Sequence, residues 1–195
     1  RTFCMNPNGE VVQENYSGIA TVNGHSYANY KTPNTNFALL VSEKFTEPFK
    51  EPIQYGQHIA RLANMLGGGI LVQRFGDLLD GRRSTPERIK SSVITPTLAC
   101  ATPGDLSLVI PYRQMTSIIE MLQALDKIAP GTASRYTLLY GIEVKFYSAR
   151  VKLTNELETE GVKNLFTIGD GAGVTRGLLQ ASASGVYVAR TICER

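Results

Sequence analysis

The sequence is poor in the residues that usually build metal and redox centres. It has three cysteines, Cys4, Cys100 and Cys193, no CxxC pair, and two histidines, His25 and His58. An odd number of widely spaced cysteines excludes a zinc ribbon or a dithiol redox centre and favours reduced thiols in the cytoplasm. Because two histidines alone cannot build a typical zinc site, we expect no metal.

Long apolar runs and a strong net charge are also missing. No run approaches the roughly 20 apolar residues of a membrane helix, so no membrane partner is expected. The net charge is +3, without the clustered Lys and Arg that nucleic-acid binding requires, which excludes nucleic acid as a partner and suits a small anionic ligand. The chain opens on Arg1, without an initiator Met or a signal peptide, and we interpret it as a fragment or a processed chain.

The apolar pattern predicts an α+β fold with a mixed sheet and packed helices. Helical spacing is clear over residues 59–66 and 115–125, and Ser-Thr-Pro-Glu at 84–87 is typical of a third helix start. Apolar runs predict strands at residues 37–41 (buried on both faces), 70–72, 106–110 and 137–146. The apolar parity flips after the last run, which predicts a bulge or break near Tyr147-Ser148.

The segment with the clearest chemistry is residues 164–173, Asn-Leu-Phe-Thr-Ile-Gly-Asp-Gly-Ala-Gly. We expect a strand at 165–168, a glycine-rich turn, and a helix over 174–193. Glycine lets the backbone approach a ligand closely, and a helix start offers unpaired N–H groups and a positive dipole end. Ionised Asp170 only accepts hydrogen bonds, which suits a sugar-like hydroxyl better than a phosphate. The alternative is a plain strand-to-helix turn that binds nothing.

This arrangement resembles the C-terminal strand–Gly-Asp–helix element of glutathione-reductase-type flavoproteins. The resemblance implies that Asp170 hydrogen-bonds the ribityl chain of FAD and that the backbone around Gly173-Val174 faces the pyrimidine edge of the flavin. The helix dipole would then stabilise the negative charge of reduced flavin. The cofactor-binding residues that it implies are Gly169, Asp170, Gly171, Ala172, Gly173 and Val174.

Four motifs, at 1–12, 22–27, 34–39 and 168–177, resemble in order a bacterial family of uncharacterised FAD-dependent dehydrogenases. The resemblance implies an FAD-dependent dehydrogenase acting on a small-molecule substrate. The chain departs from the family pattern at Asn6 and Asn8, where Cys and Gly are expected, and at His25, where Met is expected. With Asn6 in place of a cysteine, Cys4 has no neighbouring thiol, which argues against a redox thiol pair.

Gly67-Gly68-Gly69 is not a dinucleotide fingerprint, because it follows a helix and precedes a strand, the reverse of the required order. A helix C-cap explains it better. The adenine-binding half of FAD must therefore come from an N-terminal FAD-binding domain of the same protein. We expect residues 1–160 to form a substrate or cap-type domain and residues 161–195 to be the returning strand and helix of the FAD domain.

Two functional classes remain open. The first is a flavoenzyme that passes a hydride or electrons through FAD, with NAD(P)H as a plausible donor and the fragment alone inactive. The second is a non-catalytic, flavoprotein-like domain that binds a partner. His25 and Arg176 are the candidate catalytic residues, each weighed against a solvated side chain. Glu143 and Lys145 form a further candidate pair on one strand face, for which solvent exposure is the default.

Small residues recur every four positions in the final helix, at Gly177, Ala181, Gly185 and Ala189. We expect this bare ridge to pack on the FAD-binding domain, because two glycines inside a helix need a reason. Four apolar residues lie off the ridge and are expected on the body instead: Leu178, Leu179, Val186 and Ile192.

Overall fold

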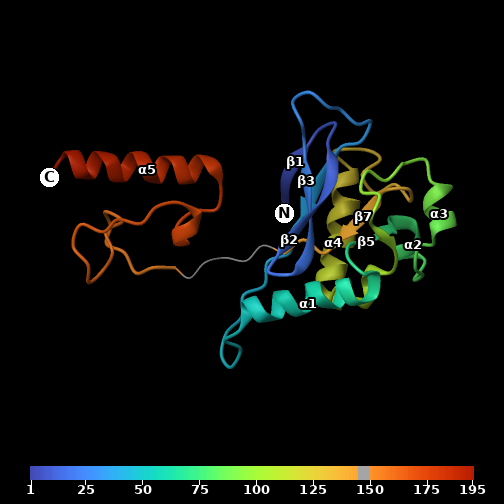
Figure 1. The fold of residues 1–195 in the computed structure, drawn as a ribbon, viewed down its shortest axis with the longest axis horizontal. Helices are drawn as coiled ribbons and strands as arrows, with labels where there is room; N and C mark the ends of the chain where they lie inside the picture. Colours follow the sequence, from blue (N-terminus) through green and yellow to red (C-terminus); the bar gives the residue numbers. More distant parts are fainter. Residues whose placement is uncertain (145–149) are drawn as a thin grey trace. The chain divides into compact units, whose positions relative to one another are not determined.

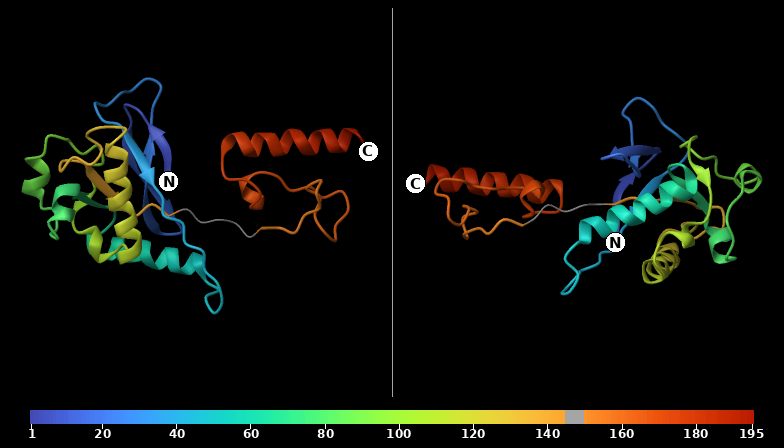
Figure 2. Two further views of the ribbon diagram at one scale, coloured as in Figure 1. Left: turned by 180° about the vertical axis from the view of Figure 1, so that it is seen from behind. Right: turned by 60° about the horizontal axis from the view of Figure 1, so that its bottom comes forward.

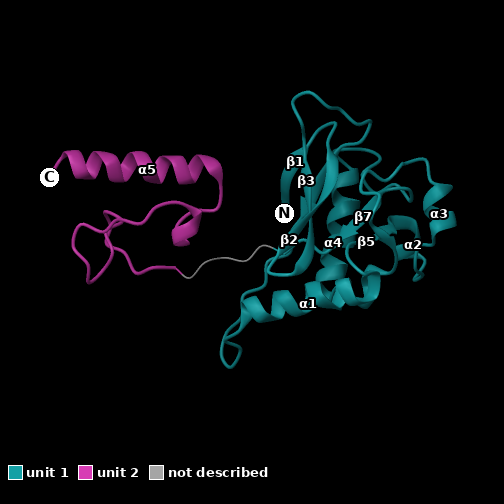
Figure 3. Ribbon diagram, in the orientation of Figure 1, with its two compact units in different colours: residues 1–144 teal, residues 145–195 magenta. Residues whose placement is uncertain are grey.

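The computed structural model describes residues 1–144 and 150–195 (Figure 1). The chain divides into two compact units, Arg1–Val144 and Lys145–Arg195 (Figure 3). Strands and helices are mixed without regular alternation, which confirms the α+β class. The predicted bulge near Tyr147-Ser148 lies outside the described residues.

Unit 1 contains three small sheets. The first pairs β1 (Thr2–Asn6) with β4 (Asn36–Leu39), and the second is a hairpin of β2 (Glu10–Tyr16) and β3 (Ile19–His25); both pairs are antiparallel. Ser17 and Gly18 form the two-residue hairpin turn, both with positive φ (51° and 79°), as a turn that matches the strand twist requires. In the third sheet, β5 (Leu71–Arg74) runs parallel to β6 (Thr102–Pro103) and antiparallel to β7 (Leu138–Gly141).

Four helices complete unit 1: α1 (Pro52–Gly67), α2 (Phe75–Leu79), α3 (Pro86–Lys90) and α4 (Tyr112–Asp126). Figure 2 shows α1 and α4 from two further directions. The core of the unit lies between β5 and the helices. Leu71 of β5 and Phe75 of α2 pack in one cluster with Met115 and Leu122 of α4. Leu71, Phe75 and Leu122 are almost completely buried, so each of them contributes to the apolar stabilisation of the unit.

The predicted helices of unit 1 are confirmed. Helix α1 ends at Gly68, whose backbone is left-handed (φ 68°) and whose N–H donates to the Asn64 carbonyl at 2.7 Å. Gly67-Gly68-Gly69 is therefore the expected C-cap. The Asn64 side chain also accepts from Ala20 N–H at 2.8 Å and donates to its carbonyl at 2.9 Å, which fixes α1 to β3. Thr85 caps α3 by accepting from the Arg88 N–H.

Three predicted strands of unit 1 are corrected. Residues 106–110 contain a 3₁₀ helix, η1 (Leu106–Leu108), because Asp105 Oδ1 accepts the Ser107 N–H at 2.9 Å and Gln73 Oε1 accepts the Leu106 N–H at 2.8 Å. The run 37–41 yields only β4, which is half-buried, since it pairs with β1 alone. Among the described residues of the run 137–146, a strand forms only at Leu138–Gly141, which is β7.

Unit 2 holds a short 3₁₀ helix, η2 (Asp170–Ala172), and α5 (Leu178–Cys193). The predicted strand 165–168 is wrong: the described residues of unit 2 form only isolated bridges, Glu158 with Phe166 and Leu153 with Thr159. The predicted helix starts four residues late, because Gly173 is left-handed (φ 68°) and ends η2, while Gly177 is extended (φ 168°).

Arg195 connects α5 to an earlier segment of unit 2. Arg195 Nη2 lies 2.5 Å from Glu156 Oε2 and 2.5 Å from Glu158 Oε2, and its guanidinium stacks 4.9 Å from the centroid of the Phe166 ring. These contacts raise the pKa of Arg195 and lower the pKa of Glu158, first through their mutual hydrogen bond. The end of α5 is thus tied to the segment that precedes the glycine turn.

Only the middle of the small-residue ridge of α5 is covered within unit 2, whereas Ala189 is exposed and a Cβ on Gly177 would meet no heavy atom within 4 Å. Ala181 and Gly185 are half-buried within unit 2: an ideal Cβ on Gly185 would meet Ile168 Cδ1 at 3.7 Å, and one on Gly169 would meet Ala181 Cβ at 3.8 Å. Ala181 and Gly185 therefore pack on the loop that carries the glycine turn, and packing of the ridge on an FAD-binding domain stays a prediction. The four apolar residues off the ridge are exposed, from 52% for Val186 to 90% for Leu178.

Candidate functional site

The glycine turn is a closed loop held at the start of α5. Gly169 has φ 73° and Gly173 φ 68°, conformations that glycine adopts without strain. Val174 N–H donates to the Gly169 carbonyl at 3.3 Å, and Gly169 N–H donates to Ser184 Oγ of α5 at 3.1 Å. Ser184 is buried, so the turn is anchored to a fixed point on the helix.

Asp170 sits at the centre of the turn. Its Oδ1 accepts the hydroxyl of Thr175 in a very short hydrogen bond and the N–H of Gly177 at 3.3 Å. Asp170 itself is exposed, whereas Thr175 is buried. The carboxylate therefore links the two ends of the loop, from the turn to the start of α5.

Space is open around two of the glycines of this loop, Gly171 and Gly177. A Cβ added to Gly171 or to Gly177 would meet no heavy atom within 4 Å. Gly177, at the N-cap of α5, has no side chain to cap the helix, and no acidic residue lies in the first turn. The backbone N–H groups at this helix end are thus available to an incoming polar group, and the dipole favours a negative one.

The two candidate catalytic residues lie in different units. Arg176 is half-buried in unit 2, and its Nη1 donates to the Thr175 carbonyl at 3.0 Å, so it belongs to the loop of Asp170. His25 is exposed at the end of β3 in unit 1, where its ring meets that of Tyr27 edge-on at 4.3 Å. Glu143 lies in unit 1, and its predicted companion Lys145 lies outside the described residues.

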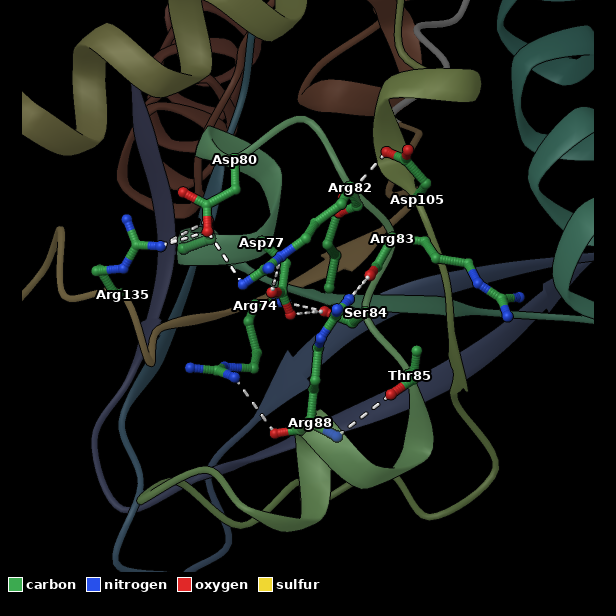
Figure 4. Close-up of polar contacts among 12 residues, drawn as sticks. Arg74, Asp77, Asp80, Arg82, Arg83, Ser84, Thr85, Arg88, Asp105 and Arg135 are labelled. Atoms are coloured by element: carbon green, nitrogen blue, oxygen red, sulfur yellow. Dashed lines mark hydrogen bonds and ion pairs between the residues drawn. The ribbon is translucent and has the colours of Figure 1, made fainter.

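A polar network in unit 1 was not predicted from the sequence (Figure 4). Asp77 is almost fully buried, with Oδ1 3.0 Å from Arg82 Nε and Oδ2 2.8 Å from the Ser84 hydroxyl. Ser84 Oγ in turn accepts the N–H of Arg74 at 2.9 Å. Gln73, fully buried inside β5, donates to the Arg82 carbonyl at 2.9 Å. An apolar strand interrupted by Gln and followed by Asp was the one signal that could have revealed this network.

In the outer part of the network, the Asp80 carboxylate is paired with two arginines. Asp80 Oδ2 binds Arg135 at 2.5 Å and Arg82 at 3.1 Å. The hydrogen bond from Arg135 lowers the pKa of Asp80, and the same bond raises the pKa of Arg135. The Arg74 guanidinium stacks 5.1 Å from the centre of the Tyr136 ring. Because the two carboxylates are paired with arginines of the same network, we interpret it as the scaffold of the 73–85 segment rather than a reaction centre.

Within residues 1–144 and 150–195, no group of three or more His, Cys, Asp or Glu side chains could hold a metal ion. The helices in that part of the chain are too short or too polar to cross a membrane.

Comparison with known proteins shows which family the mixed α+β body belongs to. Residues 1–146 match the family "FAD-dependent protein, C-terminal domain-like". The chain belongs to this family. The match covers unit 1 and ends before the glycine turn.

One relative spans the whole chain. An uncharacterized protein of Clostridium beijerinckii (strain ATCC 51743 / NCIMB 8052) is 32% identical over 206 residues, which cover 100% of this chain and 38% of the relative. The chain thus spans well under half the length of that relative. The resemblance to glutathione-reductase-type flavoproteins in particular stays a prediction.

Proposed function

We propose that this chain is the C-terminal part of a longer FAD-dependent oxidoreductase, a dehydrogenase, and that its glycine turn holds the flavin side of FAD. The observation that carries the proposal is the family match over residues 1–146. The length of the Clostridium relative supports a larger protein, of which this chain would be about two fifths. The remaining part would include the N-terminal FAD-binding domain that supplies the adenine site.

The residues of unit 2 fit the flavin side of FAD. Asp170 offers an exposed carboxylate to ribityl hydroxyls, and hydrogen bonds to a charged acceptor contribute about 1.5–3 kcal/mol. The open space at Gly171 and Gly177 lets the backbone come close to a flat ring. The N-terminus of α5 presents N–H groups at the place where negative charge would develop. When bound, FAD would supply the hydride or electron transfer.

The other members of the site have binding roles in this proposal. Gly169, Ala172, Gly173 and Val174 shape the turn, and Arg176 adds a cation near the pyrimidine edge. Unit 1 would act as the substrate or cap-type domain, with His25 as its candidate acid–base residue and a small molecule as substrate. NAD(P)H is the proposed electron donor. The odd number and wide spacing of Cys4, Cys100 and Cys193 favour the reducing cytoplasm as the proposed location.

Flavin absorbance of the intact longer protein tests this proposal. We expect stoichiometric FAD after purification and bleaching of its colour by NADH or NADPH under anaerobic conditions. The 195-residue chain alone should bind FAD weakly or not at all. Intact protein that neither contains nor takes up flavin would overturn the proposal, and flavin that no reductant bleaches would favour the non-catalytic, partner-binding alternative.

A further inference from the structure

Asp170 and Thr175 differ sharply in their surroundings, although their side chains are hydrogen-bonded. Asp170 is exposed on η2, and Thr175 is only 8% exposed. The Thr175 hydroxyl and the Gly177 N–H both donate to the same carboxylate oxygen, Oδ1. One oxygen of an exposed carboxylate is thus held by a buried hydroxyl and by the backbone.

Thr175 is well suited to fix another side chain. Its β-branch restricts χ1, and its burial limits rotation further. The backbone on either side is also held, since Val174 N–H donates to the Gly169 carbonyl at 3.3 Å and Arg176 Nη1 donates to the Thr175 carbonyl at 3.0 Å. The hydroxyl therefore has a defined position from which to orient Asp170.

We propose that Thr175 is a positioning residue that orients the Asp170 carboxylate for the flavin side of FAD. The inference rests on the proposed function. An exposed carboxylate that rotates freely must be ordered when a ligand binds, and this ordering weakens affinity. A carboxylate already held by Thr175 and Gly177 avoids part of that loss. Thr175 thus strengthens flavin binding through Asp170 without touching the cofactor.

Two substitutions of similar size separate the hydroxyl from the shape of the side chain. Thr175→Val keeps the branched shape and loses the hydroxyl, so the dissociation constant of FAD for the intact apoprotein should rise about 5- to 10-fold. Thr175→Ser keeps the hydroxyl and should stay within about 2-fold of the parent. Flavin fluorescence on titration with apoprotein measures both. Thr191→Val is the matched control, because the Thr191 hydroxyl donates to the Tyr187 carbonyl of its own helix at 3.1 Å.

A double-mutant cycle shows whether Thr175 acts through Asp170. In an Asp170→Ala background, Thr175→Val should have no further effect on FAD affinity. An equal loss in both backgrounds would overturn the inference, as would a Thr175→Val variant with parental affinity. Thermal melting of each apoprotein shows whether the variant is folded. If Thr175→Val does not fold, the FAD affinity of Thr175→Ser, expected within about 2-fold of the parent, tests the inference instead. If the parent itself binds no FAD, the proposed function fails before Thr175 is tested.

Discussion

Arg82 Nε lies 3.0 Å from Oδ1 of Asp77, whose side chain is 1% exposed while that of Arg82 is 49% exposed. The pair connects the inside of unit 1 with its surface. The second Asp77 oxygen accepts the Ser84 hydroxyl, and the Arg82 N–H donates to the Asp77 carbonyl at 3.0 Å. One buried carboxylate thus closes the loop that runs from α2 to α3.

Asp77→Ala should destabilise unit 1 by about 2–3 kcal/mol. The substitution leaves the buried Ser84 hydroxyl without its acceptor, whereas water can still reach the half-exposed Arg82. Urea denaturation of the 195-residue chain, followed by circular dichroism, measures the loss. Asp80→Asn, at the more exposed end of the network, is the matched control and should cost clearly less. Equal losses for the two variants would contradict the role given to Asp77.

The buried Tyr140 phenol should make the free energy of unfolding of unit 1 depend on pH in the alkaline range. Burial raises the pKa of the Tyr140 phenol from 10.0 to about 12, and a hydrogen bond with the Thr97 backbone offsets part of the shift. The unfolded chain releases this proton near pH 10 and the folded chain only near pH 12. Tyr140 therefore contributes stability that is complete below about pH 10 and is lost as the pH rises to about 12, by at most about 1.4 kcal/mol per pH unit.

The comparison of two variants isolates this contribution. Tyr140→Phe should lose less of its free energy of unfolding than the parent between pH 10 and 12. Tyr112→Phe, at a tyrosine that is 87% exposed, should follow the parent. Denaturant midpoints at several pH values give both slopes. A Tyr140→Phe slope equal to that of the parent would show that the phenol is not protected in the folded state.

Gly171→Ala separates folding from ligand binding at the glycine turn. A methyl group at this position meets no heavy atom within 4 Å, so the melting temperature of the chain should not change. If the flavin approaches the backbone here, the same methyl group should weaken FAD binding to the intact protein by about tenfold or more. Gly185→Ala, on α5, should keep the parental FAD affinity. An unchanged affinity for Gly171→Ala would remove Gly171 from the binding site.

The sequence predicted the elements whose signals are local. The apolar spacing of residues 115–125 lies within α4, and Gly68 ends α1 because a left-handed cap needs no partner elsewhere. The strand predicted at 106–110 is wrong for a non-local reason. Gln73 from β5 accepts the Leu106 N–H, and this contact favours a 3₁₀ turn. A strand at 165–168 needs a neighbour, and the described part of the chain offers only the bridge to Glu158.

For the candidate site, the sequence predicted the position of the glycine turn but not the start of the helix or the bond from Thr175 to Asp170. The glycine spacing located the turn, and the hydrogen bond from the Val174 N–H to the Gly169 carbonyl closes a loop there. The start of the helix could not be read from the sequence, because Gly177 can be helical or extended, and only the bonds to Asp170 select the extended form. The link from Thr175 to Asp170 carries no sequence signal, since threonine at such a position is ordinary.

The outer face of α5 leads to a prediction about the longer protein. Leu178 is 90% exposed and Leu179 84% exposed, and Val186 and Ile192 are also exposed. An apolar surface of this kind marks a contact with another part of a protein. In the proposed longer protein, the FAD-binding domain would cover it. Burial of each leucine there would contribute about 1.5–3 kcal/mol.

Leu178→Ser with Leu179→Ser should therefore affect the two forms of the protein differently. The 195-residue chain should keep its stability, because both side chains are already in water and serine is tolerated at the start of a helix. The intact protein should lose several kcal/mol, measured by denaturation followed through protein fluorescence. Val188→Ser, at a residue 6% exposed inside unit 2, is the control that should destabilise both forms. An intact double variant as stable as its parent would show that the FAD-binding domain does not cover this face.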